Sequence, residues 1–183
     1  MGFETCGPNE VLIVSGVGHS RPKFKCGGWV FVWPKLQQVQ RLSLNLMTLS
    51  IETLDACTQQ GITVSVKAVA QVRIVSSNQE LLKIASENFL GKSEEEIGST
   101  IKATLESLQK TIISTMNLED VYFDSDKKFF KTMYEEGSSE LINMGVQIVS
   151  YKVVDVMDKK GHLEALIKKK MEDKTKEVAS SAE

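Results

Sequence analysis

Residues 62–75 form the longest run of alternating apolar and polar side chains in the chain. Every even position from Ile62 to Ile74 carries Ile, Val or Ala, and most odd positions carry Thr, Ser, Lys, Gln or Arg. A period of two over this length predicts a long β-strand with one face in a core and the other in water. The buried face needs covering layers, so the rest of the chain has to supply them.

Helical periodicity dominates most of residues 78–177. Ser77 to Glu80 and Ser93 to Glu96 have the spacing of capping boxes and predict two helix starts. A third helix over about residues 126–143, ended by Gly145, leads into a strand at 146–157. A final helix over about residues 162–178 has a narrow apolar stripe, typical of a two-helix seam, formed by Leu163, Leu166, Ile167, Met171 and Val178.

The first 60 residues are expected to form further strands. The apolar positions of residues 42–51 change register near Leu46, which predicts a bulge or bend. Shorter strands are expected at 11–15 and 29–33, with turns at Gly7-Pro8-Asn9 and Gly27-Gly28. These elements predict an α+β fold over residues 1–158, a twisted and mainly antiparallel sheet packed by three helices, followed by a helical segment at 159–183.

Composition limits the classes of function. Lys and Arg number 22 against 24 Asp and Glu, so the basic excess of a nucleic-acid binder is missing. Three widely spaced cysteines indicate a reducing compartment rather than a disulfide framework. The early apolar runs are too short for a secretion signal, and none approaches the roughly 20 residues that cross a bilayer. A chain of this kind that meets a membrane is expected to lie on it.

Motifs for catalysis, metals and cofactors are not recognisable. Gly91-Lys92-Ser93 lacks the earlier glycine of a phosphate-binding loop and reads as a helix stop followed by a helix cap. His19 and His162 are the only histidines, and a pairing of His19 with Cys26 has no third group to orient it. We therefore predict no enzyme, no metal, no cofactor and no small-molecule substrate.

Two features suit an interface. The alternation Trp29-Phe31-Trp33, flanked by Lys23, Lys25 and Lys35, either enters the polar layer of a membrane or packs against the sheet. The run of three lysines at residues 168–170 either meets acidic lipid headgroups or forms an ordinary solvated helix face, and the acidic neighbours around it favour the second.

Six segments, in the same order along the chain, resemble flotillins, also called reggie proteins. Flotillins belong to the wider group of stomatin, prohibitin and flotillin (SPFH, or band 7) domains. They are GPNEVLIVSG (7–16), GGWVFVWP (27–34), QRLSLNLMTL (40–49), GITVSVKAVAQVRI (61–74), FLGKSEEEI (89–97) and NMGVQIVSYKVVDV (143–156). The match includes irregular turns as well as strands, and extends to about residue 168.

The resemblance implies a scaffold of membrane microdomains, including lipid rafts and caveolae, on the cytoplasmic leaflet of the plasma membrane and on endosomes. It implies contact with membrane lipids, flotillin-like homo- or hetero-oligomers, and roles in endocytosis, trafficking and signalling platforms. A soluble adaptor that binds proteins through the Trp29-Phe31-Trp33 face and the last helix, without lipid contact, is the alternative.

The resemblance also implies fatty acylation, and here the sequence departs from the family pattern. The myristoylation signal is met at Gly2 but carries Cys6 where Ser or Thr is required. Lys35 stands where some flotillins have an acylated cysteine, which leaves Cys6 and Cys26 as thioester candidates and Cys57 as a weaker one. Each cysteine is otherwise an ordinary small apolar residue.

The long coiled coil of flotillins is the second departure. Residues 159–183 correspond to its first turns, truncated relative to the family, and Leu163, Leu166, Ile167 and Met171 are the candidate oligomer contacts. About two turns of such a seam are too few to hold a higher oligomer alone. We expect weak self-association or incorporation into assemblies of longer relatives.

Overall fold

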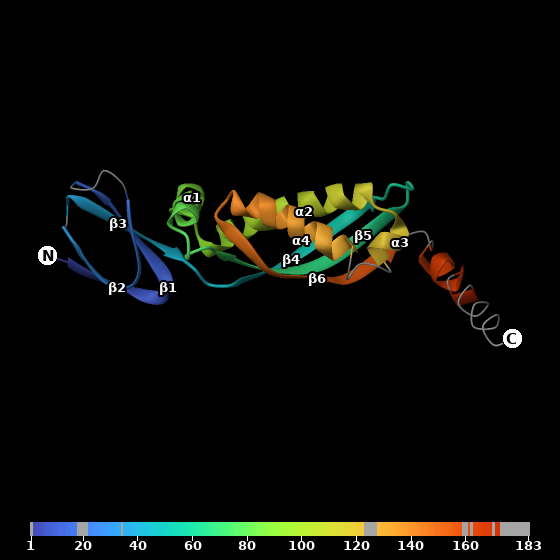
Figure 1. The fold of residues 1–183 in the computed structure, drawn as a ribbon, viewed down its shortest axis with the longest axis horizontal. Coiled ribbons are helices and arrows are strands. Elements are labelled where there is room, and N and C mark those ends of the chain that lie inside the picture. Colours follow the sequence, from blue (N-terminus) through green and yellow to red (C-terminus); the bar gives the residue numbers. More distant parts are fainter. Residues whose placement is uncertain are drawn as a thin grey trace.

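The strands of the computed structural model form two three-stranded antiparallel sheets that follow one another along an elongated molecule (Figure 1). The structure describes residues 2–17, 22–33, 35–122, 128–158, 161, 163–169 and 171–172. The predicted α+β class is confirmed, with the strands shared between two sheets. The division of the chain at residue 158 stays a prediction.

The N-terminal sheet contains β1 (Gly2–Gly16), β2 (Lys23–Val32) and β3 (Gln37–Ser43) in the order β2-β1-β3. Between the pairs Cys6↔Gly28 and Val11↔Cys26, four residues of β1 lie opposite one residue of β2, so the predicted turn at residues 7–9 is a wide bulge inside a strand. The predicted turn at residues 27–28 is wrong, because both glycines lie inside β2. Their φ angles of +67° and +91° let β2 follow the bulge without ending.

The change of register near Leu46 marks a change of sheet. The strand β3 ends at Ser43, residues 44–46 cross over, and β4 (Met47–Cys57) starts the second sheet. The predicted bend is confirmed, and it separates two strands rather than kinking one. A hydrogen bond of 2.8 Å from the Leu44 N–H to the Asn9 carbonyl ties this crossing to the bulge of β1.

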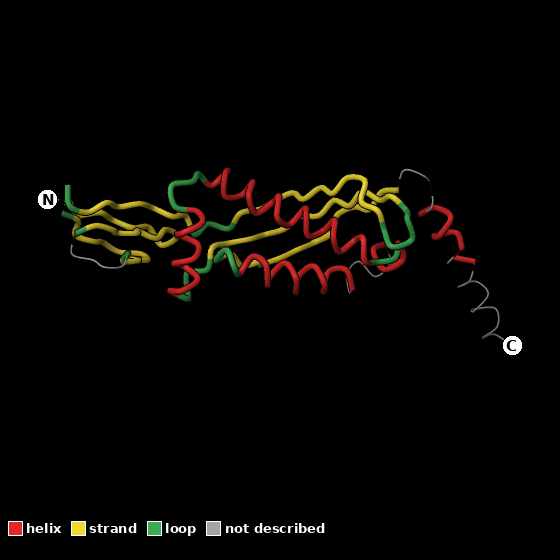
Figure 2. The backbone as a smooth tube through the Cα atoms, turned by 90° about the horizontal axis from the view of Figure 1, so that it is seen from above, coloured by secondary structure: helices red, strands yellow, loops and turns green. Residues whose placement is uncertain are grey.

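The second sheet contains β4, β5 (Thr63–Ile74) and β6 (Val146–Asp158) in the order β4-β5-β6. As the alternation predicts, the even positions of β5 from Val64 to Ile74 are buried, and they face the helices. The helices α2 (Glu94–Thr115) and α4 (Phe130–Ile142) run over one face of this sheet (Figure 2). The opposite face stays open to solvent.

Helix starts follow the capping pattern closely. At α2 both hydrogen bonds of the predicted capping box between Ser93 and Glu96 are present. At α1 (Gln79–Phe89) the cap is Asn78 rather than Ser77, because the Asn78 side chain accepts the Glu80 N–H at 2.9 Å. The short helix α3 (Leu118–Tyr122) is not anticipated by the periodicity.

The last predicted helix is described only in part. Residues 163–169 are helical, and Leu163 packs against the core next to the second sheet. His162, all of residues 173–183 and the predicted start of the third helix at residue 126 lie outside the described residues. The coiled coil therefore stays a prediction.

Candidate functional site

Four aromatic rings are gathered on one face of the N-terminal sheet. Trp29 and Phe31 alternate along β2, Trp33 directly follows the last residue of that strand, and β1 contributes Phe3, which lies directly opposite Phe31. Edge-to-face contacts join Phe3 to Trp29 and to Phe31 at 5.5 Å between ring centroids, and Phe31 to Trp33 at 6.3 Å. We call Phe3, Trp29, Phe31 and Trp33 the aromatic patch.

The rings of the aromatic patch are exposed although they contact one another edge to face. The exposed fraction is 66% for Phe3, 64% for Trp29, 39% for Phe31 and 58% for Trp33. Of the two sequence interpretations, an interface face or a layer packed against the sheet, the exposed position fits the first. Clusters of large apolar side chains in water commonly mark a surface that contacts a partner or a lipid phase.

The sequence interpretation missed Phe3. No apolar run surrounds Phe3, because its neighbours are Gly2, Glu4 and Thr5. A window of ten residues around it therefore does not indicate a strand. The available signal is the pairing of β1 with β2, which follows only once the long bulge at residues 7–10 is known.

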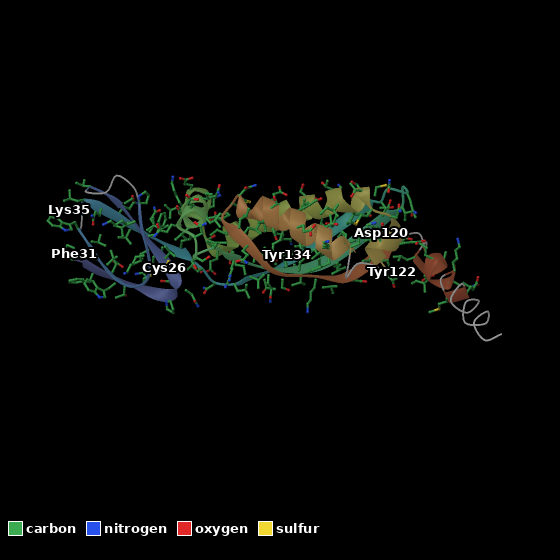
Figure 3. The ribbon with its side chains drawn as sticks, in the orientation of Figure 1. Cys26, Phe31, Lys35, Asp120, Tyr122 and Tyr134 are labelled. Atoms are coloured by element: carbon green, nitrogen blue, oxygen red, sulfur yellow. The ribbon has the colours of Figure 1, made fainter. Side chains whose placement is uncertain are left out.

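Three lysines border the aromatic patch. Lys23 and Lys25 are exposed, and they line a small pocket of about 150 Å³ together with Val14, Val30 and Phe31. Lys35 lies in the turn that follows Trp33, at the same end of the molecule as Phe31 (Figure 3). The predicted basic flank is therefore next to the aromatic side chains in the fold.

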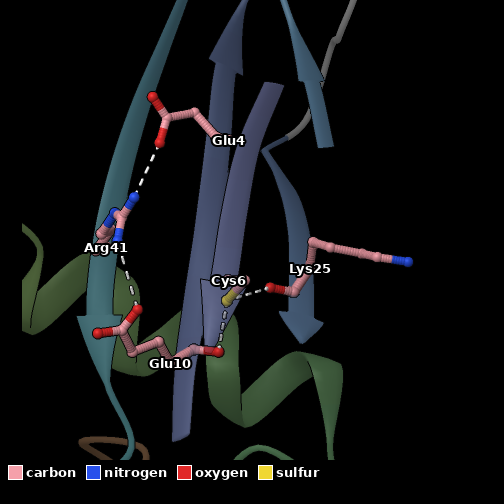
Figure 4. A network of polar contacts seen from close by, with 5 residues as sticks. All are labelled: Glu4, Cys6, Glu10, Lys25 and Arg41. Carbon is pink, nitrogen blue, oxygen red and sulfur yellow. Dashed lines mark hydrogen bonds and ion pairs between the residues drawn. The ribbon is translucent and has the colours of Figure 1, made fainter. Parts of the chain in front are cut away.

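Cys6 sits in a polar network under the bulge of β1. Only 8% of its surface is exposed, and its Sγ donates to the Glu10 carbonyl at 2.9 Å and lies 3.5 Å from the Lys25 carbonyl (Figure 4). The Arg41 guanidinium holds the two ends of the bulge, at 2.9 Å from the Glu4 carboxylate and 3.6 Å from that of Glu10. An acyl chain on Cys6 would require this network to open.

The other lipidation candidates are more accessible. Cys26 and Cys57 are exposed, and Gly2, the first residue of β1, pairs with Val32 beside the aromatic patch. Partial burial, and to a smaller extent the neighbouring Cys6, raises the pKa of the Cys26 thiol. In the folded chain Cys26 is thus the open thiol nearest to the patch, in its neutral form at ordinary pH.

The candidate oligomer contacts of the last helix range from buried to exposed. Leu163 is buried, Leu166 and Ile167 are half-buried, and Met171 is exposed. Leu166 packs against the same core as Leu163. The first turn of this helix thus packs against the core, and the stripe becomes accessible toward Met171.

Other kinds of site were sought in the described part of the chain. No three of its His, Cys, Asp or Glu residues come together in a way that would bind a metal ion. None of the described helices combines the length and apolar character needed to cross a bilayer. His19 lies outside the described residues.

Comparison with known proteins completes this description. Residues 4–183 match the family model described as SPFH domain / Band 7 family. The chain is 48% identical over 165 residues to Flotillin-1 of Drosophila melanogaster, and 43% identical over 164 residues to Flotillin-1 of Homo sapiens and of Carassius auratus. Each alignment covers 90% of this chain and 38% of the relative, so the chain spans well under half the length of these relatives.

Proposed function

Because the chain belongs to the flotillin branch of the SPFH domain / Band 7 family, we propose that it is a membrane-associated scaffold domain rather than an enzyme. It lies on the cytoplasmic leaflet of the plasma membrane, in microdomains such as rafts and caveolae, and on endosomes. There it assembles with flotillin-like copies and supports endocytosis, trafficking and signalling platforms. Its partners are membrane lipids and other flotillin-like chains.

The aromatic patch is the observation that carries the lipid contact. Trp side chains favour the boundary between headgroups and acyl chains, because an apolar ring and a polar N–H are both accommodated there. Full burial of a large apolar side chain contributes about 1.5–3 kcal/mol, and these partly covered rings would contribute about 1 kcal/mol each. Phe3, Trp29, Phe31 and Trp33 then supply the apolar half of the attachment.

Lys23, Lys25 and Lys35 supply the electrostatic half. A lysine near an acidic lipid surface adds about 1 kcal/mol, and salt weakens this attraction. Together the rings and lysines give about 7 kcal/mol before the cost of ordering, which is a weak and reversible attachment. A second anchor or several copies side by side are needed for stable residence on the membrane.

Acylation is the second anchor that we propose. Cys26 is the first candidate in the folded chain because its thiol is exposed, and Gly2 lies beside the aromatic patch. Cys6 remains a candidate for a chain modified before the N-terminal sheet closes. Each of these positions places an acyl chain on the sheet that carries the patch.

Oligomer formation rests on the last helix and on the coiled coil that the family implies. Leu163 and Leu166 pack the start of this helix against the core, and Ile167 and Met171 continue the stripe. Association of this chain alone is expected to be weak, since so short a seam supplies little contact.

Flotation with vesicles tests the lipid contact. The unacylated chain is mixed with vesicles of phosphatidylcholine, with or without phosphatidylserine, and centrifuged under a density gradient. The wild-type chain should float, and more strongly with phosphatidylserine. The double variant Trp29→Ser and Trp33→Ser should bind about tenfold more weakly or worse, because two ring contributions are removed.

A matched control uses exposed apolar side chains of the second sheet. The double variant Leu54→Ser and Val154→Ser replaces two exposed apolar side chains away from the patch, and it should float like the wild type. A wild-type chain that stays at the bottom with every vesicle composition would instead favour the soluble adaptor, in which the same face binds protein partners.

A further inference from the structure

A polar pocket lies at the junction of the two sheets, away from the aromatic patch. Its volume is about 170 Å³, and it is lined by Pro8, Asn9, Leu44, Arg73, Ile74, Val75, Ser76, Ser77 and Gln147. It therefore joins the bulge of β1, the crossing between the sheets, the end of β5 and the start of β6. Figure 1 shows α1 at this junction.

Arg73 is the only charged residue among those that line the pocket. It is the penultimate residue of β5, and its cross-strand neighbour on β6 is Gln147. No hydrogen bond or ion pair joins the Arg73 guanidinium to another described residue. The pocket lining thus includes an exposed positive charge whose donors have no partner among the described residues and form the fork that matches phosphate oxygens.

The remaining polar groups of the pocket are neutral donors. Among the lining residues, Ser76 and Ser77 carry hydroxyls, and Asn9 and Gln147 carry side-chain amides. Residues 76–77 also lead directly into α1, an eleven-residue helix, so the positive end of its dipole follows the pocket lining along the chain. This helix end adds to the attraction for an anion, which rests primarily on Arg73 and the pocket.

Competing carboxylates are engaged elsewhere or do not line the pocket. Glu10 follows Asn9, and its carboxylate lies 3.6 Å from the Arg41 guanidinium. Glu80, in the first turn of α1, is exposed and is not among the lining residues. A ligand with two or more negative oxygens would therefore meet donors on several sides without a facing acid.

We propose that this junction pocket binds a phosphate group, with Arg73 as its principal ligand-binding residue and Ser76, Ser77, Asn9 and Gln147 as neutral donors. The size suits one phosphate or phosphomonoester group rather than a nucleotide. The site goes beyond the proposed function and does not depend on the aromatic patch. The group belongs either to free phosphate or to a phosphorylated lipid headgroup.

An NMR titration with inorganic phosphate, at constant ionic strength set with chloride, tests the site directly. The amide signals of residues 73–77 and the Arg73 side-chain signal should shift and saturate. Arg73→Ala should weaken phosphate binding about tenfold or more, since charge-assisted hydrogen bonds are lost. Arg73→Lys should retain part of the affinity, because the charge remains and the fork does not.

Lys152→Ala is the matched control. Lys152 lies on β6, the strand that pairs with β5. It is exposed, has no partner among the described residues and does not line the pocket. Its removal should leave phosphate binding unchanged. The Trp29→Ser and Trp33→Ser chain should also bind phosphate like the wild type, so failure of the lipid contact and failure of this site are separable.

Vesicles distinguish the source of the phosphate group. Phosphatidylcholine vesicles containing phosphatidylinositol 4-phosphate are compared with vesicles containing unphosphorylated phosphatidylinositol. An Arg73-dependent preference for the phosphorylated lipid assigns the site to a headgroup, and Arg73-dependent binding of inorganic phosphate alone assigns it to the free ion. Shifts that do not saturate, or that are equal in wild type and Arg73→Ala, would overturn the proposal.

Discussion

Tyr151 is a buried phenol whose hydroxyl has no partner. Its side chain is 1% exposed, and its Oη makes no hydrogen bond within the described residues. Loss of water around the ring raises the pKa of Tyr151 above its ordinary value of 10.0. The folded state therefore binds the phenolic proton more tightly than the unfolded state does.

This burial predicts a pH dependence of stability. The raised pKa of Tyr151 stabilises the folded state fully below about pH 10, and this stabilisation is lost as the pH rises above that value. Tyr151→Phe should leave the free energy of unfolding at pH 7 unchanged or raise it by up to about 1 kcal/mol, since an unpaired polar atom is removed. It should also reduce the loss of stability above pH 10. Urea denaturation at pH 7 to 11 measures both effects, and an equal alkaline loss in the two proteins would contradict this account.

The cysteines should differ in reactivity. Cys6 donates its S–H inside the bulge network, whereas Cys26 and Cys57 are exposed. A maleimide reagent should label Cys26 and Cys57 in the native chain and reach Cys6 only when the N-terminal sheet opens. Because the pKa of Cys26 is raised, its labelling rate should keep increasing beyond the pH range usual for thiols.

Single-cysteine variants with Ser at the other two positions, labelled with and without denaturant, make this measurement. In denaturant the three thiols should react at similar rates, which serves as the control. Native labelling of Cys6 as fast as that of Cys26 would show that the network is open in solution. The two thiols would then be equally accessible to acylation.

Residue types were easier to predict from the sequence than residue environments. The Trp29-Phe31-Trp33 alternation identified three members of the aromatic patch, since alternate residues share a face of a strand. Phe3 and the burial of Cys6 were not predictable, because both depend on pairing across a bulge in which four residues of β1 oppose one of β2. No local pattern encodes that register.

At the scale of elements, the connection from α4 to β6 depends on Gly145. Its φ is +78°, and a Cβ placed there would lie 2.5 Å from the Leu81 carbonyl oxygen and 2.6 Å from the Ala85 Cβ of α1. Gly145→Ala combines the cost of a left-handed backbone, about 1–2 kcal/mol, with a steric conflict of about 1–3 kcal/mol. The free energy of unfolding should fall by roughly 2–5 kcal/mol.

Gly61→Ala provides the comparison, because Gly61 has nearly the same φ of +77° and open space around it. This variant should lose only the backbone cost of about 1–2 kcal/mol. Urea denaturation of the two variants separates the two terms. Equal losses would mean that α1 moves away from Gly145 without cost and does not brace the connection.

Elements with strong periodic patterns were predicted well. The strand β5 follows its alternation, and α2 begins at its capping box with Ile97, Ile101 and Leu105 buried. The errors occur where glycines were read as turns, as at residues 27–28, and where the helix α3 has too few residues to show a period. A positive φ is compatible with a bulge as well as with a turn, so composition alone does not distinguish them.

At the scale of the whole molecule, the separation into two sheets means that distinct surfaces lie at opposite ends of the elongated chain. The change of register near Leu46 was visible in the sequence, but the number of sheets on either side of it was not. The aromatic patch lies on the N-terminal sheet, whereas the last helix leaves from the opposite end (Figure 1). An elongated domain of this shape can contact a membrane at one end while the other end is free for assembly.

This arrangement makes tryptophan fluorescence a specific probe of orientation. The chain contains two Trp residues, Trp29 and Trp33, and both belong to the aromatic patch. On addition of vesicles containing phosphatidylserine, their emission should shift to shorter wavelength and become less accessible to acrylamide, because indoles leave water for the headgroup boundary. Phospholipids brominated on the acyl chain should quench it.

A thiol-linked fluorophore attached to Met171→Cys reports on the opposite end of the molecule. The three native cysteines are replaced by Ser in this variant. Met171 is exposed on the last helix, so this fluorophore should stay accessible to acrylamide when the indoles are protected. Protection of the fluorophore together with unchanged Trp emission would mean that the last helix, rather than the aromatic patch, meets the lipid. Protection of the indoles alone would mean that one end of the chain binds the membrane and leaves the last helix in water, where it is accessible to neighbouring copies.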